Sequence, residues 1–123
     1  ESQIKIYHLD GTYTGKSINA RFFPNEAEGI VLYPCGDGGY YLATDQSSAM
    51  NTFHIFDRNS LEYVGSFRGE IVRNTDGIAV TNRQFGPFAR GAFYAVHDDG
   101  NTVAFDWTDI AEAFKLRIDC PSG

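Results

Sequence analysis

Three acidic residues and one glutamine stand where they could hold a metal cation together. Glu28 and Asp76 are each followed by glycine and isoleucine, and each stands at the start of an apolar run. Glu26 lies two positions before Glu28, and Gln46 follows another apolar stretch between the two acids. Two acids in the same setting suggest one structural unit used twice. They also suggest a cation bound where the two units meet.

These side chains also have ordinary structural explanations. An acid next to glycine often caps a turn, and Gln46 could form a hydrogen bond within its own loop. The segment from Asp98 to Asn101 fits a plain hairpin turn as well as a cation-binding turn. The three histidines of the chain lack the spacing of metal ligands, and the sequence contains no Gly-x-Ser-x-Gly motif and no P-loop.

Composition narrows the class of protein. The 123 residues suffice for one domain with a sizeable core, and 42% hydrophobic with 15% aromatic residues is typical of a β-rich globular chain. The net charge of −6 argues against nucleic acid as a partner, because phosphate backbones require a basic face. It is compatible with metal binding and also with mere solubility. No apolar run approaches the roughly 20 residues that cross a bilayer, so we expect no membrane partner.

The two cysteines, Cys35 and Cys120, are too far apart in sequence for a C-x-x-C motif. They form either one disulfide that ties the C-terminal tail to the turn at 33–38 or two unrelated buried thiols. We favour the disulfide, because the tail around Cys120 would otherwise fray. A disulfide there implies a secreted protein in an extracellular or periplasmic setting.

Alternating and short apolar runs predict nine strands and one helix. The strands are expected at 2–9, 12–20, 29–33, 40–44, 52–57, 61–68, 77–81, 92–96 and 102–106. The helix is expected at 107–114, with Asp109 as its cap and with Ile110, Ala113 and Phe114 on one face.

The pattern repeats with a period near 50 residues. The run 51–57 matches 101–106, the run 4–7 matches 53–56, and Glu28-Gly29-Ile30 matches Asp76-Gly77-Ile78. Four short strands per period are typical of a β-propeller blade, and a plain sandwich is the alternative. We assign residues 1–20 to the outer strands of one blade, 26–68 to a second blade, 76–116 to the last blade with its helix, and 117–123 to a tail.

The number of blades is too small for a ring. Two periods and half of a third amount to about two and a half blades, whereas propellers close with four to eight. The chain is therefore expected to be either a C-terminal fragment of a larger propeller, which we favour, or a short subunit that self-associates to close a ring.

Seven motifs in order carry a resemblance to a known family. They are acid-x-Glu-Gly-apolar at 26–30, Tyr-Leu-Ala-x-x-Gln at 41–46, aromatic-Asp-Arg at 56–58, Thr-Asp-Gly-Ile at 75–78, Gly-Pro-x-x-x-Gly at 86–91, Asp98 to Asn101, and Trp-Thr-Asp-Ile-Ala at 107–111. Together they resemble the β-propeller phytases, secreted calcium-dependent phosphatases that act on inositol hexakisphosphate. The resemblance runs from residue 26 to about 114 and implies the last blades of a six-bladed propeller.

The resemblance implies a set of calcium ligands. Glu28, Glu26, Gln46 and Asp76 match positions on the metal-rich rim of the central channel, and Glu26 stands where the family has a shorter aspartate. The turn positions Asp98 and Asn101 match a calcium-binding turn of the last blade. The family also has a longer acidic run before Thr-Asp-Gly-Ile, whereas this chain has the shorter 70–74 with the cation Arg73. At least one ligand of the family is therefore expected to be missing.

The implied function is calcium-dependent hydrolysis of phosphomonoesters such as phytate, by an enzyme that needs its remaining blades. Calcium would neutralise the substrate phosphates and lower the pKa of a bound water. The lysines and arginines that hold the phosphates in the family lie in blades outside this sequence. The alternatives are a catalytically silent phytase-like module that binds a partner through the same rim, and the short subunit that closes a ring.

Overall fold

The computed structural model describes residues 3–98 and 100–121, and nine strands dominate this part of the chain. They are β1 (Ile4–Tyr7), β2 (Tyr13–Ile18), β3 (Ala27–Cys35), β4 (Gly38–Asp45), β5 (Thr52–Asp57), β6 (Tyr63–Phe67), β7 (Ile78–Thr81), β8 (Ala92–His97) and β9 (Asn101–Asp106). A 3-10 turn, η1 (Ala20–Phe22), and one α-helix, α1 (Trp107–Phe114), complete the described part. The predicted all-β class is confirmed.

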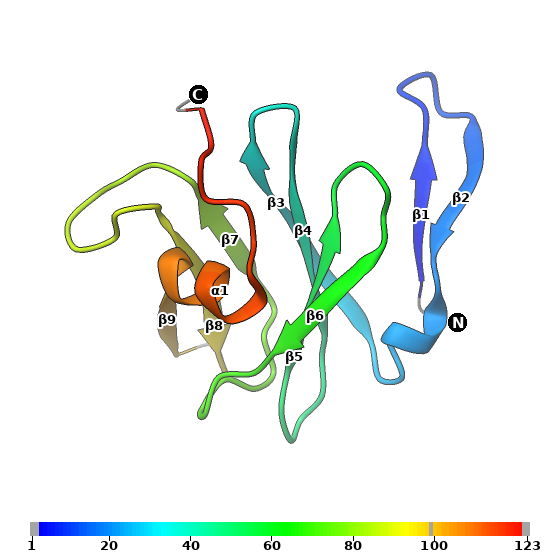
Figure 1. Ribbon diagram of the computed structural model, residues 1–123. Coiled ribbons are helices and arrows are strands. Elements are labelled where there is room, and N and C mark those ends of the chain that lie inside the picture. Colours follow the sequence, from blue (N-terminus) through cyan, green and yellow to red (C-terminus); the bar gives the residue numbers. More distant parts are fainter. Residues whose placement is uncertain (1–2, 99, 122–123) are drawn as a thin grey trace.

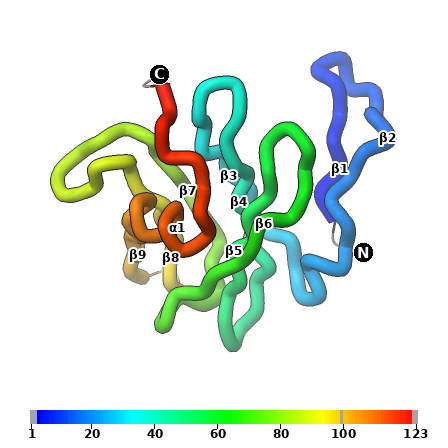
Figure 2. The backbone as a smooth tube through the Cα atoms, in the orientation of Figure 1, coloured from blue at the N-terminus to red at the C-terminus, as the bar shows by residue number. Residues whose placement is uncertain are grey.

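The strands form three antiparallel sheets that stand side by side (Figure 1). Their orders are β1-β2, β3-β4-β5-β6 and β7-β8-β9, so neighbours in sequence are neighbours in each sheet. The tube in Figure 2 shows the β1–β2 hairpin at one side of the molecule and β7–β9 with α1 at the other. Up-and-down sheets placed face to face are the arrangement of propeller blades.

The middle sheet contains the four strands expected of one repeat unit. β3 pairs with β4 from Ala27↔Asp45 to Cys35↔Gly38. All six residues of β5 pair with β4, from Tyr40↔Asp57 to Asp45↔Thr52. The second residue of β4, Gly39, must be glycine, because its φ is +128° and an added Cβ would collide with the carbonyl oxygen of Tyr33 on the paired strand.

The third sheet has three strands, and α1 follows where the middle sheet has its fourth strand. The helix has the predicted bounds, but the predicted cap is wrong. Asp106 accepts a hydrogen bond from the Thr108 N–H at 3.0 Å and caps the helix, whereas Asp109 lies exposed in its first turn. The cap must precede the first helical residue, because only there can its side chain reach the free N–H groups.

The buried face of α1 also differs from the expected one. Trp107, Ile110 and Ala111 are buried, whereas the predicted Ala113 is exposed. These buried residues join the main core, which fills the space between the middle and third sheets. Its largest members with essentially no exposed surface are Trp107, Phe53, Phe93, Leu42 and Ile55.

A smaller core lies between the β1–β2 hairpin and the opposite face of the middle sheet. It consists of Ile18, Phe23, Ala43 and Phe56, with Phe22 of η1 packed against it. The middle sheet is therefore covered on both faces, as expected for a blade with a neighbour on each side.

The strands β3 and β7, which contain the isoleucines of the repeated acid–glycine–isoleucine run, lie next to each other. An added Cβ on Gly29 would lie 2.9 Å from Cγ1 of Ile78, so β3 and β7 approach closely at these positions. The glycine makes room for the isoleucine of the next sheet. This contact sets the spacing of the two sheets at the end where the candidate ligands stand.

Cys35 and Cys120 form a disulfide, with Cα atoms 4.6 Å apart and a separation of 85 positions in sequence. The bond ties the C-terminal tail to the end of β3, as Figure 1 shows by the course of the last segment. The disulfide prediction is confirmed, and the alternative of two separate buried thiols is wrong.

Candidate metal-binding rim

The four residues Glu26, Glu28, Gln46 and Asp76, here called the rim, lie at one end of the middle and third sheets. β3 begins at this end, β4 finishes there and β7 starts there, so three strand ends meet. Gln46 Nε2 donates a hydrogen bond to Asp76 Oδ1 at 3.4 Å. The fold therefore brings together two rim residues from different sheets that are 30 positions apart in sequence.

Glu28 lies at an irregular point of β3. The register between β3 and β4 shifts between Ala27 and Ile30, so Glu28 and Gly29 form a β-bulge. Bulges re-aim side chains and are frequent next to functional sites. The carboxylate of Glu28 is exposed, and within the described chain it forms no recorded hydrogen bond or ion pair.

Glu26 is positioned through its backbone. Its N–H donates to Asp45 Oδ1 at 2.9 Å, and its carbonyl oxygen accepts the N–H of Gln46 at 2.7 Å. These bonds place Glu26 directly beside Gln46, while the carboxylate of Glu26 remains exposed. Glu26, Gln46 and Asp76 therefore follow one another along the rim.

Asp45 is a site residue that the sequence analysis missed. It is only 3% exposed, and besides the Glu26 N–H it accepts bonds from the Asn25 N–H at 3.0 Å and from Asn25 Nδ2 at 2.8 Å. A buried carboxylate needs such partners to compensate for lost hydration. Asp45 therefore holds the start of β3 in place. Its only sequence signal is its position next to Gln46.

The β8–β9 turn carries Asp98, which the resemblance links to calcium. Asp98 Oδ1 accepts a bond from Asn74 Nδ2 at 2.7 Å, and its Oδ2 pairs with Arg73 Nε at 3.0 Å. The pKa of Asp98 is held below its usual value, mainly by the hydrogen bond from Asn74 and next by the one from Arg73. Asn101, the other predicted ligand in this turn, is exposed at the start of β9, where it pairs with His97.

Arg73 thus places a positive charge beside Asp98, on the segment where the phytase family has acidic residues. Further hydrogen bonds attach the same segment to the third sheet, among them one from the Arg73 N–H to His97 Nδ1 at 3.3 Å. The Asp98 N–H donates to the carbonyl oxygen of Arg73 at 3.2 Å, and Thr75 Oγ1 donates to the carbonyl oxygen of Val96 at 2.8 Å. Asn51 Nδ2 also donates to Thr75 Oγ1, which connects this segment to the loop that follows Gln46.

The rim fits calcium in the type of its donors, but within the described chain its carboxylates do not converge on one point. Calcium takes six to eight oxygen ligands, and the rim offers three carboxylates and one amide oxygen. Gln46 now presents its amide nitrogen to Asp76, and only its oxygen can ligate a cation. Within residues 3–98 and 100–121, no three His, Cys, Asp or Glu side chains are grouped closely enough to hold a metal ion. The described residues can form one wall of such a site.

His54 lies inside the molecule, away from the rim carboxylates. It is 8% exposed and is surrounded by Phe22, Phe23, Phe56 and Tyr63. This burial lowers the pKa of His54 below its ordinary value. The imidazole is therefore neutral at neutral pH and packs as part of an aromatic cluster, as expected for a structural histidine.

Acidification should destabilise the protein through His54. Folding lowers the pKa of the His54 imidazole, so the unfolded chain binds a proton at this side chain more readily than the folded chain does. The free energy of unfolding is therefore highest above about pH 6.5, the pKa of an unfolded histidine, and decreases as the pH falls below it. We expect His54→Phe to reduce the loss of stability between neutral and mildly acidic pH, as measured by urea denaturation. His8→Phe, at an exposed position, is the matched control and should leave the loss unchanged. An unaltered pH profile in His54→Phe would refute this role.

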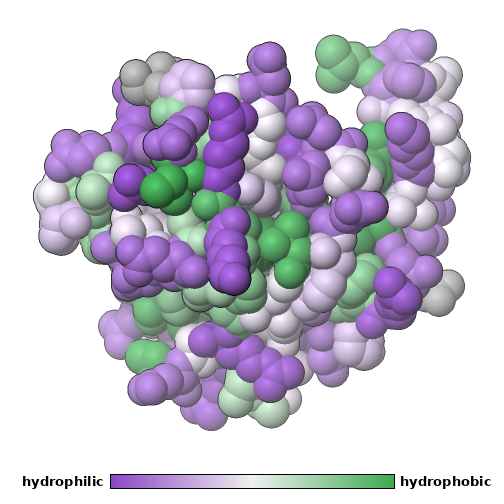
Figure 3. Space-filling model, in the orientation of Figure 1, coloured by the Kyte–Doolittle hydropathy of each residue, from purple (hydrophilic) through white to green (hydrophobic). Residues whose placement is uncertain are grey.

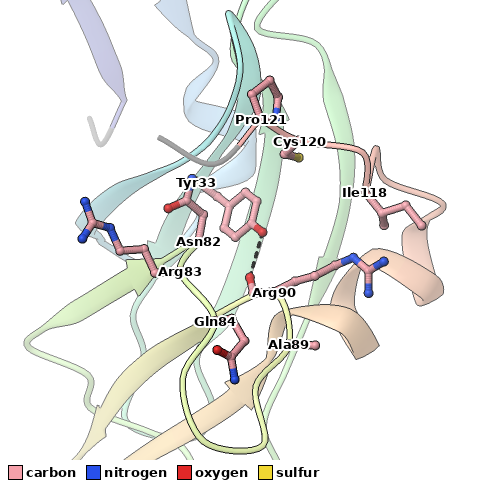
Figure 4. A pocket seen from close by; sticks show the side chains of 9 residues that line it. All are labelled: Tyr33, Asn82, Arg83, Gln84, Ala89, Arg90, Ile118, Cys120 and Pro121. Atoms are coloured by element: carbon pink, nitrogen blue, oxygen red, sulfur yellow. Dashed lines mark hydrogen bonds between the residues drawn. The ribbon is translucent and has the colours of Figure 1, made fainter.

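A separate pocket of about 500 Å³ lies at the other end of β3 and β7 (Figure 4). Arg83 and Arg90 contribute cations to its wall, but their guanidinium groups point in opposite directions. Tyr33 OH donates to the carbonyl oxygen of Arg90 at 2.8 Å and Asn82 Nδ2 donates to that of Pro34, so these polar groups are already paired within the protein. The described residues that line the pocket therefore offer no convergent set of ligand-binding groups.

Comparisons with protein-family models, with curated proteins and with solved structures found no match for this chain. Among the helices of the described chain, none is long and apolar enough to cross a membrane. The disulfide is evidence for an oxidising environment.

Proposed function

We propose that this chain forms one wall of the active site of a calcium-dependent, phytase-type phosphatase that acts on phytate or a related phosphorylated compound. The observation that carries the proposal is the contact between Gln46 and Asp76, which unites two predicted ligands from neighbouring sheets at one end of the molecule. The order of the seven motifs supports it. The complete enzyme includes further propeller blades that supply the cations for the substrate phosphates, and it is secreted.

In this proposal Glu28, Asp76, Glu26 and Gln46 hold calcium through their side-chain oxygens. Bound calcium would neutralise phosphate charge and acidify a water molecule. Asp45 orients Glu26 and Gln46 through the backbone and makes no contact with the substrate. Arg73 neutralises Asp98, so this turn contributes less to metal binding than the rim does.

The test combines calcium binding with phosphate release, using the complete protein that contains this chain. Glu28→Gln and Asp76→Asn keep the size of each side chain and remove its charge. We expect each to weaken calcium binding, measured by titration calorimetry, by about tenfold or more and to lower calcium-dependent release of phosphate from phytate. Asp109→Asn, an exposed acid on α1, is the matched control and should change neither quantity.

The Arg73–Asp98 ion pair favours one alternative, a catalytically silent module that binds a partner through the same rim. A fixed guanidinium at this turn replaces the charge that a metal ion would supply. The two functions differ in one measurement. Phosphate release that requires calcium and stops on chelation supports the enzyme, whereas no release by the complete protein at any calcium concentration rejects it.

A further inference from the structure

The contact between the middle and third sheets contains a knob and a slot. Ile78 of β7 is the knob, and Gly29 of β3 is the slot, because any side chain larger than hydrogen at position 29 would collide with Ile78. Gly29 and Ile78 belong to the two copies of the acid–glycine–isoleucine run. By the repeat, the slot and the knob are Gly29 and Ile30 in the middle sheet, and Gly77 and Ile78 in the third. The knob of the third sheet fits the slot of the middle sheet, which precedes it in the chain.

Ile30 is the knob of the middle sheet, and no glycine of the described residues forms a slot for it. It is equivalent to Ile78 in the repeat, but it is 48% exposed in the middle of a strand, whereas Ile78 is packed against the main core. Ile30 lines a groove of about 420 Å³ between the middle sheet and the β1–β2 hairpin. The apolar side chains of this groove, here called the Ile30 groove, are Ile4, Ile6, Ile18, Ile30, Tyr41 and Leu61. In Figure 3 a hollow separates the hairpin from the middle of the molecule.

The edge of β1 borders the same groove and is also incomplete. Within the described chain, β1 pairs only with β2. Its equivalent in the repeat is β5, which lies between β4 and β6 and has ladder partners on both sides. By this comparison two strands, the equivalents of β3 and β4, are lacking beside β1. An unpaired strand edge is a template for another strand.

The charges around the groove indicate what fits there. Lys5, Lys16 and Arg58 line it, and its described lining residues include neither Asp nor Glu. Three cations without an acid are unusual in a chain of net charge −6. An incoming segment with acidic side chains would be attracted to this groove, and a basic one would be repelled.

We propose that the Ile30 groove and the free edge of β1 together dock an antiparallel β-hairpin of the same repeat, joined to the chain ahead of β1. Its inner strand begins with acid–glycine–apolar, and the glycine receives Ile30 as Gly29 receives Ile78. Its second strand pairs with β1 as β4 pairs with β5. The proposal rests on packing and charge and does not depend on catalysis, so it can fail or succeed independently of the proposed phosphatase.

The test supplies the hairpin from the chain's own sequence. A copy of residues 26–51 is placed directly ahead of Gln3, which reproduces the spacing between β4 and β5. We expect those amides of β1 that do not bond to β2 to exchange with solvent about tenfold more slowly or better, because they gain partners. The midpoint of denaturation should rise as well. The matched control is the same extension with its copy of Gly29 changed to Val, which should lose both effects.

A second measurement uses paired substitutions at equivalent knobs. In the unextended protein, Ile78→Ala should lower the denaturation midpoint clearly, whereas Ile30→Ala should lower it little. In the extended protein Ile30→Ala should become as damaging as Ile78→Ala. The proposal is overturned if β1 exchanges equally fast with and without the extension, or if Ile30→Ala has the same effect in both proteins. If amide exchange at β1 becomes slower as the concentration of the unextended protein is raised, a second copy of the chain occupies the groove. That result would overturn the proposal of a hairpin joined to the chain ahead of β1.

Discussion

Replacing Cys35 and Cys120 together by alanine is expected to lower the free energy of unfolding by about 4 kcal/mol. The disulfide joins residues 85 positions apart, and cross-linking a loop of this length removes about 4 to 5 kcal/mol of chain entropy from the unfolded state. Cys35 is fully buried at the end of β3, and the bond also holds the tail against the β3–β4 turn, where a Cβ added to Gly36 would lie 3.3 Å from Cδ of Pro121. The loss is a large fraction of the stability of a domain of this size.

The measurement is guanidinium denaturation followed by far-ultraviolet circular dichroism. Reduction of the wild-type protein should lower the midpoint about as much as the double substitution does, since both release the same loop. Lys115→Ala, in the segment between α1 and the tail, is a control that keeps the bond. A midpoint unchanged by reduction would show that the disulfide does not stabilise the fold.

Trp107→Ala is expected to cost about 3 to 5 kcal/mol, the usual range for removing a large aromatic side chain from a core. The indole is fully buried and lies parallel to the ring of Tyr33, with ring centroids 3.7 Å apart. It therefore connects α1 and the third sheet to the middle sheet. The cavity left by alanine would open in the main core, where surrounding side chains can collapse only partly.

Trp107→Phe is the matched control for this prediction. The Nε1–H of Trp107 is buried without a hydrogen-bond partner in the described structure, so phenylalanine removes an unpaired donor while keeping an aromatic ring. We expect Trp107→Phe to retain most of the stability that Trp107→Ala loses, as measured by urea denaturation. An equal loss in both variants would mean that the size of the indole, and not its aromatic stacking, determines the stability.

Local patterns predicted most of the elements because each arises from neighbouring residues. β5 and α1 have the predicted bounds, and the other strands differ by a few residues at their ends. The β3–β4 hairpin follows from a glycine-containing turn, and Gly36 shows the reason, since its φ of +59° favours glycine. The predicted helix start at 107 already places Asp106 at the cap position, so the prediction of Asp109, an acid inside the first turn, as the cap is wrong. The side chain before the first helical residue is the one that reaches the free N–H groups.

The partners of the candidate ligands could not be predicted in the same way. Asp98 pairs with Arg73, and Asp45 binds the backbone of Asn25 and Glu26, across separations of 19 to 25 residues. Such contacts depend on how whole sheets pack, and the side-chain types do not encode them. The resemblance linked Asp98 to calcium from its position in a motif, whereas the charge beside it in the structure is a guanidinium.

The sequence by itself determined the repeated unit, the strands within it and the acids at equivalent strand ends, because periodicity and turn residues act over short distances. The tertiary structure decided how the units meet. The fit of Ile78 against Gly29 sets the third sheet on the middle one and brings Asp76 to Gln46. It also left Ile30, on the other face of β3, 48% exposed within the described chain. These outcomes depend on close packing between segments far apart in the chain, where a single methyl group decides whether two strands can approach.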